Sequence, residues 1–163
     1  RFRYLLSRHC RVDSRNVHAY ILGEHGDSEV AAWSLTHIAG IQMDDCCRVC
    51  PRQCGLVERA GIVEQVKNSA YHIIDAKGFT NYAVGLAMVR IVQAVLRNEN
   101  SILTVSTLLG GEFGIEDVCL GVPTVVNANG ADMIFDAPLP DGERKALQAS
   151  ADCIRQIIRQ VGF

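Results

Sequence analysis

Apolar residues recur every three or four positions in four segments of the chain, which is the spacing of a helix that buries one face. These segments are residues 2–9, 58–77, 80–97 and 141–161. Gly78 directly after Lys77 is a typical helix C-cap, and Asp141 is a good N-cap for the last helix. Because residues 80–97 are apolar around most of the circumference, we expect that helix to be central and buried.

Shorter stretches rich in β-branched residues predict strands at residues 17–22, 101–107, 118–127 and 133–137. Asn129-Gly130 is a strong signal for a hairpin between the last two. After the first strand we expect a short helix through Trp33, capped by Asp27 or Ser28. Helices that flank a block of consecutive strands indicate the α+β class, in one domain over residues 1–163.

The composition is that of a globular domain, with a net charge of −2 over 163 residues. This charge predicts no nucleic-acid partner, and no apolar run is long enough to predict a membrane partner. No signal peptide is visible, so we expect a cytoplasmic protein. The first helical pattern begins at Phe2 without a capping residue, which predicts a chain that starts inside a helix of a longer protein. The chain shows no G-x-G-x-x-G fingerprint after a strand.

The polar segment 42–55 contains Pro51 and four cysteines, and it predicts an irregular surface stretch. Cys47-x-x-Cys50 has the spacing of a zinc site, and four thiolates could close a tetrahedral site. All four cysteines lie within nine residues, however, whereas structural zinc sites pair two separated halves. We therefore favour reduced surface thiols and expect no metal. The four residues are Cys46, Cys47, Cys50 and Cys54.

His25 lies in the loop Gly23-Glu24-His25-Gly26-Asp27-Ser28, directly after the first predicted strand. Histidine is the commonest general acid or base and titrates near neutral pH, and the adjacent glycine allows another group to approach the backbone. On the local sequence alone, a loop histidine without a catalytic role is the alternative interpretation.

Several motifs resemble the L-lactate dehydrogenase family, in its bacterial, fermentative and allosteric branch. They are Arg1-Phe2-Arg3, residues 16–29 around His25, residues 70–80, and Ser101-Ile102-Leu103-Thr104-Val105-Ser106 followed by Gly121-Val122-Pro123. The resemblance covers essentially the whole chain. It implies the C-terminal, substrate-binding domain of the lactate/malate dehydrogenases, in which long helices pack on an antiparallel sheet. The N-terminal Rossmann domain would then be absent.

The resemblance implies that His25 takes the hydroxyl proton of lactate as hydride leaves for NAD, and returns it to pyruvate in the reverse reaction. The family's aspartate partner of this histidine would lie just upstream of Arg1. Arg1 matches the arginine that binds the substrate carboxylate, Thr80 lies beside the substrate's small side group, and Val84 faces the nicotinamide. Without the resemblance, these three residues would be interpreted as a solvated arginine, a helix N-cap and a core residue.

Arg3 and His18 match the residues that bind fructose 1,6-bisphosphate in the allosteric bacterial enzymes. The alternative is a surface arginine and a strand histidine without a ligand. The resemblance also implies a homotetramer or dimer, with the chain's own N-terminal NAD domain as a further partner. The isolated domain is then expected to be inactive. Two rival functions stay open: a malate dehydrogenase, which Thr80 and Ser28 disfavour, and a non-catalytic module for assembly or metal binding.

Overall fold

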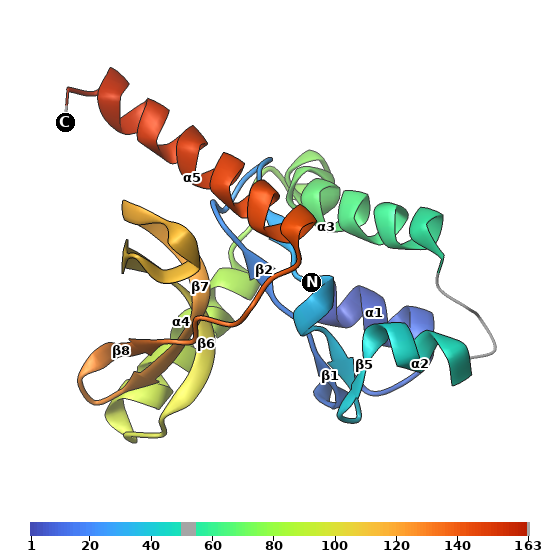
Figure 1. The fold of residues 1–163 in the computed structure, drawn as a ribbon. Coiled ribbons are helices and arrows are strands. Elements are labelled where there is room, and N and C mark those ends of the chain that lie inside the picture. Colours follow the sequence, from blue (N-terminus) through green and yellow to red (C-terminus); the bar gives the residue numbers. More distant parts are fainter. Residues whose placement is uncertain (50–54, 163) are drawn as a thin grey trace.

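The computed structural model describes residues 1–49 and 55–162, which form helices and small antiparallel sheets (Figure 1). The N-terminal part consists of α1 (Phe2–Cys10), η1 (Ser14–Asn16), β1 (Val17–His18), β2 (Ile21–Leu22), β3 (Val30–Ala31), η2 (Trp33–Leu35), β4 (His37–Ile38), β5 (Ile41–Gln42) and α2 (Met43–Val49). The C-terminal part consists of α3 (Leu56–Lys77), α4 (Tyr82–Leu96), β6 (Ser101–Gly110), η3 (Glu112–Gly114), β7 (Glu116–Asn127), β8 (Gly130–Ile134) and α5 (Asp141–Gln160). The expected α+β class is confirmed.

The described strands form three sheets, with the orders β1-β4-β5, β2-β3 and β6-β7-β8. An isolated bridge between Gly23 and Gly121 joins the end of β2 to the long strand β7. The single strand expected at residues 17–22 is wrong, because β1 and β2 are separated at Ala19 and Tyr20 and pair in different sheets. The helix expected after Asp27 is also wrong: β3 pairs with β2, and only the short turn η2 follows.

The predicted hairpin lies between β7 and β8, where Asn127 pairs with Gly130. Its two loop residues are therefore Ala128 and Asn129, and Gly130 follows with a φ of 91°. Glycine adopts this left-handed conformation without steric cost. Strand β8 consequently begins directly at Gly130 and ends at Ile134, earlier than the sequence pattern indicated.

Two hydrophobic clusters hold these elements together. One lies under the loop that follows β2 and combines strands with α5, through Leu22, Val30, Ala32, Leu109, Phe113, Ile115, Val118, Leu120, Val122, Leu147 and Ala151. The other joins α1 to α2, α3, β1, β3 and β4, through Phe2, Leu6, Val17, Ala31, Ile38, Met43 and Ile62. The first cluster fixes α5 beside the loop that contains His25.

Helix boundaries confirm some of the sequence signals and correct others. Helix α3 ends at Lys77 with Gly78 at a φ of 84°, as predicted. Helix α5 begins at Asp141, but Pro140 is its N-cap. The irregular stretch expected from residue 42 is wrong over Met43–Val49, where the buried Met43 and two aspartates in the first turn begin helix α2. The rest of the cysteine-rich segment, residues 50–54, lies outside the described residues.

Helix α4 is not the buried central helix that its apolar pattern predicted. It lies along the β6-β7-β8 sheet, but only Ala94 in its last turns is fully buried (Figure 1). Its exposed large apolar residues are Tyr82, Val84, Leu86, Met88, Val89, Val92 and Leu96. Burial requires a partner surface, and the described part of the chain supplies none for this face. None of the described helices is long and apolar enough to cross a membrane.

Candidate active site

The loop from Gly23 to Ser28 carries His25 between strands β2 and β3. At its start, Gly23 and Gly121 exchange two backbone hydrogen bonds, each with an N···O distance of 2.9 Å. Gly23 is needed here, because its φ is 93° and a Cβ atom would lie 2.5 Å from Ser150 Oγ. The base of the loop is therefore fixed to β7 on one side and to α5 on the other.

Polar contacts close the rest of the loop on itself. The Glu24 carboxylate accepts hydrogen bonds from the backbone N–H of Ser28, at 3.3 Å, and from the Ser28 hydroxyl. The carboxylate lies over Gly26, where a Cβ atom would collide with it. From the opposite side, Lys67 Nζ on α3 donates a hydrogen bond of 2.6 Å to the carbonyl oxygen of Asp27. Both chain segments that flank His25 are thus anchored, while His25 itself is exposed.

Glu29 contributes a carboxyl group next to this loop. Its Oε1 atom is buried and has no hydrogen-bond partner among the described residues. Burial raises the pKa of the Glu29 carboxyl group, and the nearby His25 and Lys67 act in the opposite direction. The first backbone nitrogen of the chain, in Arg1, also lies within electrostatic range of Glu29. The start of α1 and the His25 loop therefore face a common region.

The remaining candidates at the substrate site lie on α1 and at the α3–α4 corner. Arg1 is exposed and is the N-cap residue of α1. Thr80 is half-buried but does not cap α4, since Asn81 is the N-cap. Val84 is 54% exposed, so it is not a core residue of this chain. In the described part of the chain, no hydrogen bond or ion pair joins Thr80 or Val84 to the His25 loop.

Arg3 and His18 lie next to each other at the start of β1. Arg3 Nε donates a hydrogen bond of 2.8 Å to the Val17 carbonyl, and Nη2 donates one of 3.2 Å to the Ser14 carbonyl. His18 follows Val17 and is exposed. Directly opposite, on β4, His37 pairs with His18 in the strand register. His37 was missed in the sequence because the pairing of two-residue strands leaves no local signal.

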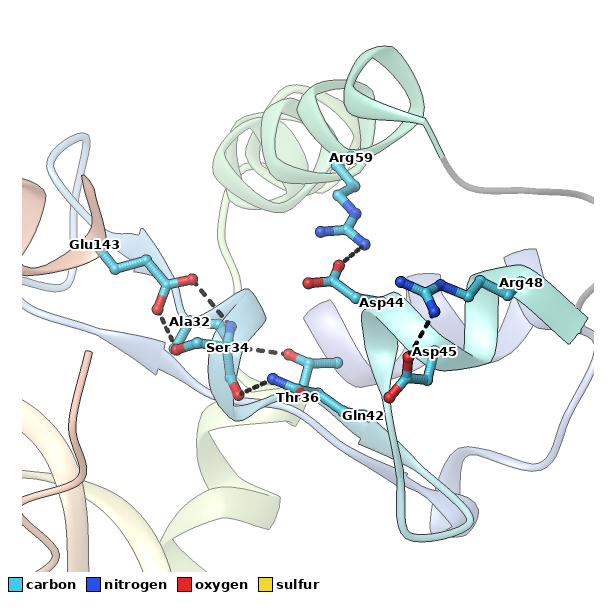
Figure 2. A network of polar contacts seen from close by, with 9 residues as sticks. All are labelled: Ala32, Ser34, Thr36, Gln42, Asp44, Asp45, Arg48, Arg59 and Glu143. Carbon is cyan, nitrogen blue, oxygen red and sulfur yellow. Dashed lines mark hydrogen bonds and ion pairs between the residues drawn. The ribbon is translucent and has the colours of Figure 1, made fainter. Parts of the chain in front are cut away.

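Figure 2 shows further polar contacts, which link α5 to η2 and α3 to α2. The Glu143 carboxylate accepts hydrogen bonds from the Ser34 backbone N–H, at 3.0 Å, and from the Ser34 hydroxyl, at 2.5 Å. Arg59 on α3 forms an ion pair of 2.5 Å with Asp44 on α2. The first turn of α5 is thus attached to the same chain segment that carries the His25 loop.

Among the described residues, no group of three or more metal-ligating side chains is close enough to hold a metal ion. Cys50 and Cys54 of the cysteine-rich segment lie outside the described residues, so the expectation of reduced thiols without a metal stays a prediction. Cys119 and Cys153, elsewhere in the chain, are exposed and not in disulfides.

The described residues form an α+β domain in which an anchored loop presents a histidine beside the C-terminal helix. Residues 1–162 match the family model of the lactate/malate dehydrogenase alpha/beta C-terminal domain, and the chain belongs to this family.

The relatives that resemble this chain in sequence are L-lactate dehydrogenases. The chain is 57% identical over 159 residues to the L-lactate dehydrogenase of Acetivibrio thermocellus, an alignment that covers 98% of this chain and 50% of the relative. It is 53% identical to the L-lactate dehydrogenase of Treponema denticola, over 99% of this chain and 51% of the relative. The chain therefore spans about half the length of the curated relatives it matches.

Solved structures show the same fold. The ligand-bound minor L-lactate dehydrogenase of Enterococcus mundtii superimposes with a TM-score of 0.94 at 39% identity, covering 98% of this chain and 51% of that one. A lactate dehydrogenase from a Medee basin deep-sea metagenome library gives a TM-score of 0.96 at 37% identity, covering 99% and 52%. The predicted fold of a lactate/malate dehydrogenase C-terminal domain is confirmed.

Proposed function

We propose that this domain supplies the substrate-binding and proton-transfer residues of an NAD-dependent L-lactate dehydrogenase, which interconverts (S)-lactate and pyruvate. The observation that carries the proposal is the exposed His25 at the tip of a loop whose two flanks are anchored. The similarity to L-lactate dehydrogenases over nearly the whole chain supports it. Malate dehydrogenase is the second candidate, because the family model includes both activities.

In this proposal His25 acts as the general base. A hydride leaves the substrate carbon well only if the hydroxyl oxygen loses its proton, so a base within hydrogen-bond distance of that oxygen is required. His25 accepts this proton in lactate oxidation and returns it in pyruvate reduction. NAD, when bound, supplies the hydride acceptor. Thr80 lies beside the substrate's small side group, and the exposed apolar surface at Val84 suits contact with a flat apolar ring.

Arg1 binds the substrate carboxylate in this proposal. A guanidinium group presents two parallel N–H donors that match a carboxylate, and this geometry fixes the orientation of the substrate. Arg1 is exposed at the start of α1, where its guanidinium group is accessible.

We also propose that Arg3 and His18 bind fructose 1,6-bisphosphate as an allosteric effector. The two hydrogen bonds to backbone carbonyls use two of the five guanidinium N–H donors of Arg3, which leaves donors for a phosphate. His18 is exposed beside it. In an otherwise complete enzyme, Arg3→Gln should abolish activation by fructose 1,6-bisphosphate and leave basal turnover unchanged.

The exposed apolar face of α4 supports two further proposals. We propose that the N-terminal NAD-binding half of the complete enzyme covers part of this face, and that the enzyme is a homotetramer or dimer. An exposed face of this kind marks an interaction surface. In this proposal the N-terminal half supplies the cradle for NAD, so we expect no measurable lactate oxidation by the 163-residue chain alone.

The decisive experiment compares His25→Gln with the unchanged residue in the full-length protein that carries this domain. The variant should lower kcat for pyruvate reduction by about 10²- to 10⁴-fold, which is the usual contribution of a general acid or base. Assays with pyruvate and oxaloacetate in parallel separate the two dehydrogenase activities. Turnover of the His25→Gln variant within threefold of the unchanged protein would overturn the proposed role.

A further inference from the structure

We propose that Ser150, on helix α5, is a positioning residue that holds the His25 loop in its active conformation. This inference rests on the proposed function of His25. Ser150 is fully buried and lies 126 residues after the loop residue that it contacts. Its hydroxyl group contacts the backbone of one residue that flanks His25 and the side chain of Ser28, the last residue of the loop.

The contacts form a closed ring of hydrogen bonds. The backbone N–H of Glu24 donates to Ser150 Oγ, at 2.8 Å. Ser150 Oγ and Ser28 Oγ are 3.1 Å apart, and the Ser28 hydroxyl donates to the Glu24 carboxylate. Because the single proton of Ser28 is directed to a carboxylate, which accepts only, Ser150 must donate its own proton to Ser28. Each hydroxyl therefore donates once and accepts once, and the ring begins and ends at Glu24.

The local packing leaves room for a small hydroxyl-bearing side chain and little else. A Cβ atom added to Gly23 would lie only 2.5 Å from Ser150 Oγ, so the loop backbone and the serine are already in close contact. Leu147 and Ala151, adjacent on the same helix, are fully buried in the hydrophobic cluster beneath the loop. An apolar residue at position 150 would leave the Glu24 N–H and the Ser28 hydroxyl without this partner.

The ring acts on His25 through its neighbours. Glu24 is bound through both its backbone and its carboxylate, whereas the described structure gives His25 no hydrogen bond of its own. The Lys67 contact to Asp27 tethers the opposite flank from α3. Loss of the Ser150 hydroxyl would keep the Lys67 tether and the two Gly23–Gly121 hydrogen bonds but would leave the Glu24 N–H without its partner, so the loop would loosen between its two fixed ends. A displacement of about 1 Å at a catalytic group reduces rate by about 100-fold.

The test measures Ser150→Ala in the full-length protein that carries this domain. We expect kcat for pyruvate reduction to fall by about 10- to 100-fold. The KM for pyruvate should change less than threefold, because Arg1 is not attached to Ser150. Hydrogen exchange at the Glu24 amide should accelerate by at least tenfold. The double variant Ser28→Ala/Ser150→Ala should lose no more than the more damaging single variant, because both hydroxyls belong to one ring.

Ser34→Ala is the matched control. It also removes a serine hydroxyl that links the N-terminal part of the chain to α5, because Ser34 donates a hydrogen bond to Glu143 (Figure 2). Unlike Ser150, Ser34 makes no hydrogen bond with the His25 loop in the described part of the chain. The kcat of this control should stay within twofold. If Ser150→Ala fails to fold, Ser28→Ala alone should also lower kcat, because it removes the hydroxyl that links Ser150 to the Glu24 carboxylate.

An unchanged kcat in Ser150→Ala or, where that variant cannot fold, in Ser28→Ala would overturn the positioning role. A fully active His25→Gln variant would instead contradict the proposed function, and the exchange result would still report on the ring.

Discussion

The loop that carries His25 and the face formed by helix α4 differ in how far this chain completes them. The loop is fixed by β7, α5 and α3, and a hydrophobic cluster that includes Leu147 lies beneath it. On α4, large apolar side chains such as Leu86 and Leu96 are 72% and 80% exposed. The contacts that hold the loop of the proposed base therefore lie within this domain, whereas the described residues leave the apolar face of α4 uncovered.

The largest expected difference between the two regions is in the free energy of unfolding when one leucine in each region is replaced by alanine. Leu147→Ala should lower the free energy of unfolding of the 163-residue chain by about 3 kcal/mol, because it removes a fully buried side chain and leaves a cavity. Leu86→Ala, a change of the same size on α4, should cost less than about 0.5 kcal/mol. Urea denaturation of both variants measures this. Equal losses would mean that α4 is already covered in the isolated chain, for example by self-association.

A charge on α4 sharpens the comparison further. Leu86→Glu should change the stability of the isolated chain by less than about 0.5 kcal/mol, because the side chain is exposed. In the full-length protein the same substitution should cost about 3 kcal/mol, since it would place an uncompensated charge in an interface. Thermal unfolding of both proteins provides the measurement. If the loss is small in both, the N-terminal half does not cover Leu86.

Glu29 gives a smaller, pH-dependent effect on the side of the loop. Its pKa is raised in the folded chain by burial, so the folded state holds the proton more tightly than the unfolded state. Stability therefore decreases as the pH rises from the ordinary pKa of 4.5 through the raised value, and the loss is complete above it. Glu29→Gln should remove this part of the pH dependence, which denaturation curves across that window would show. Parallel curves for the variant and the unchanged chain would contradict the assignment.

Local signals predicted the ends of elements better than their partners. Gly78 ended α3 where a glycine C-cap predicted, because capping depends on a few neighbouring residues. Strand pairing between β2 and β3 was missed, since two-residue strands carry no periodicity and tertiary pairing outweighed the capping potential of Asp27. The apolar pattern of residues 80–97 correctly predicted a helix but wrongly predicted that the helix is buried. A sequence pattern shows that a helix face is apolar but not what covers that face.

In the candidate site, too, some residues could be predicted from the sequence and others could be found only in the structure. His25 was found because its motif resembles a known family, and its exposed loop position agrees with that assignment, although its role stays a prediction. Ser150 carried no such signal, because it lies 126 residues from Glu24 and looks like an ordinary serine in an amphipathic helix. Glu29 was part of the recognised motif, yet its burial could be seen only when α1, α3 and the loop were placed together.

The distance between Glu24 and Ser150 along the chain also has a consequence during protein synthesis. A ribosome adds roughly 5–20 residues per second, so the 126 residues between them take roughly 6–25 seconds to make. During that interval the N-terminal strands and α1 exist without α5, and the His25 loop has neither its ring of hydrogen bonds nor the cluster beneath it. The segment that carries the proposed base is therefore synthesised early but reaches its final conformation only after α5 has been made. A nascent chain released before α5 is synthesised would contain the histidine but not the ordered loop that presents it.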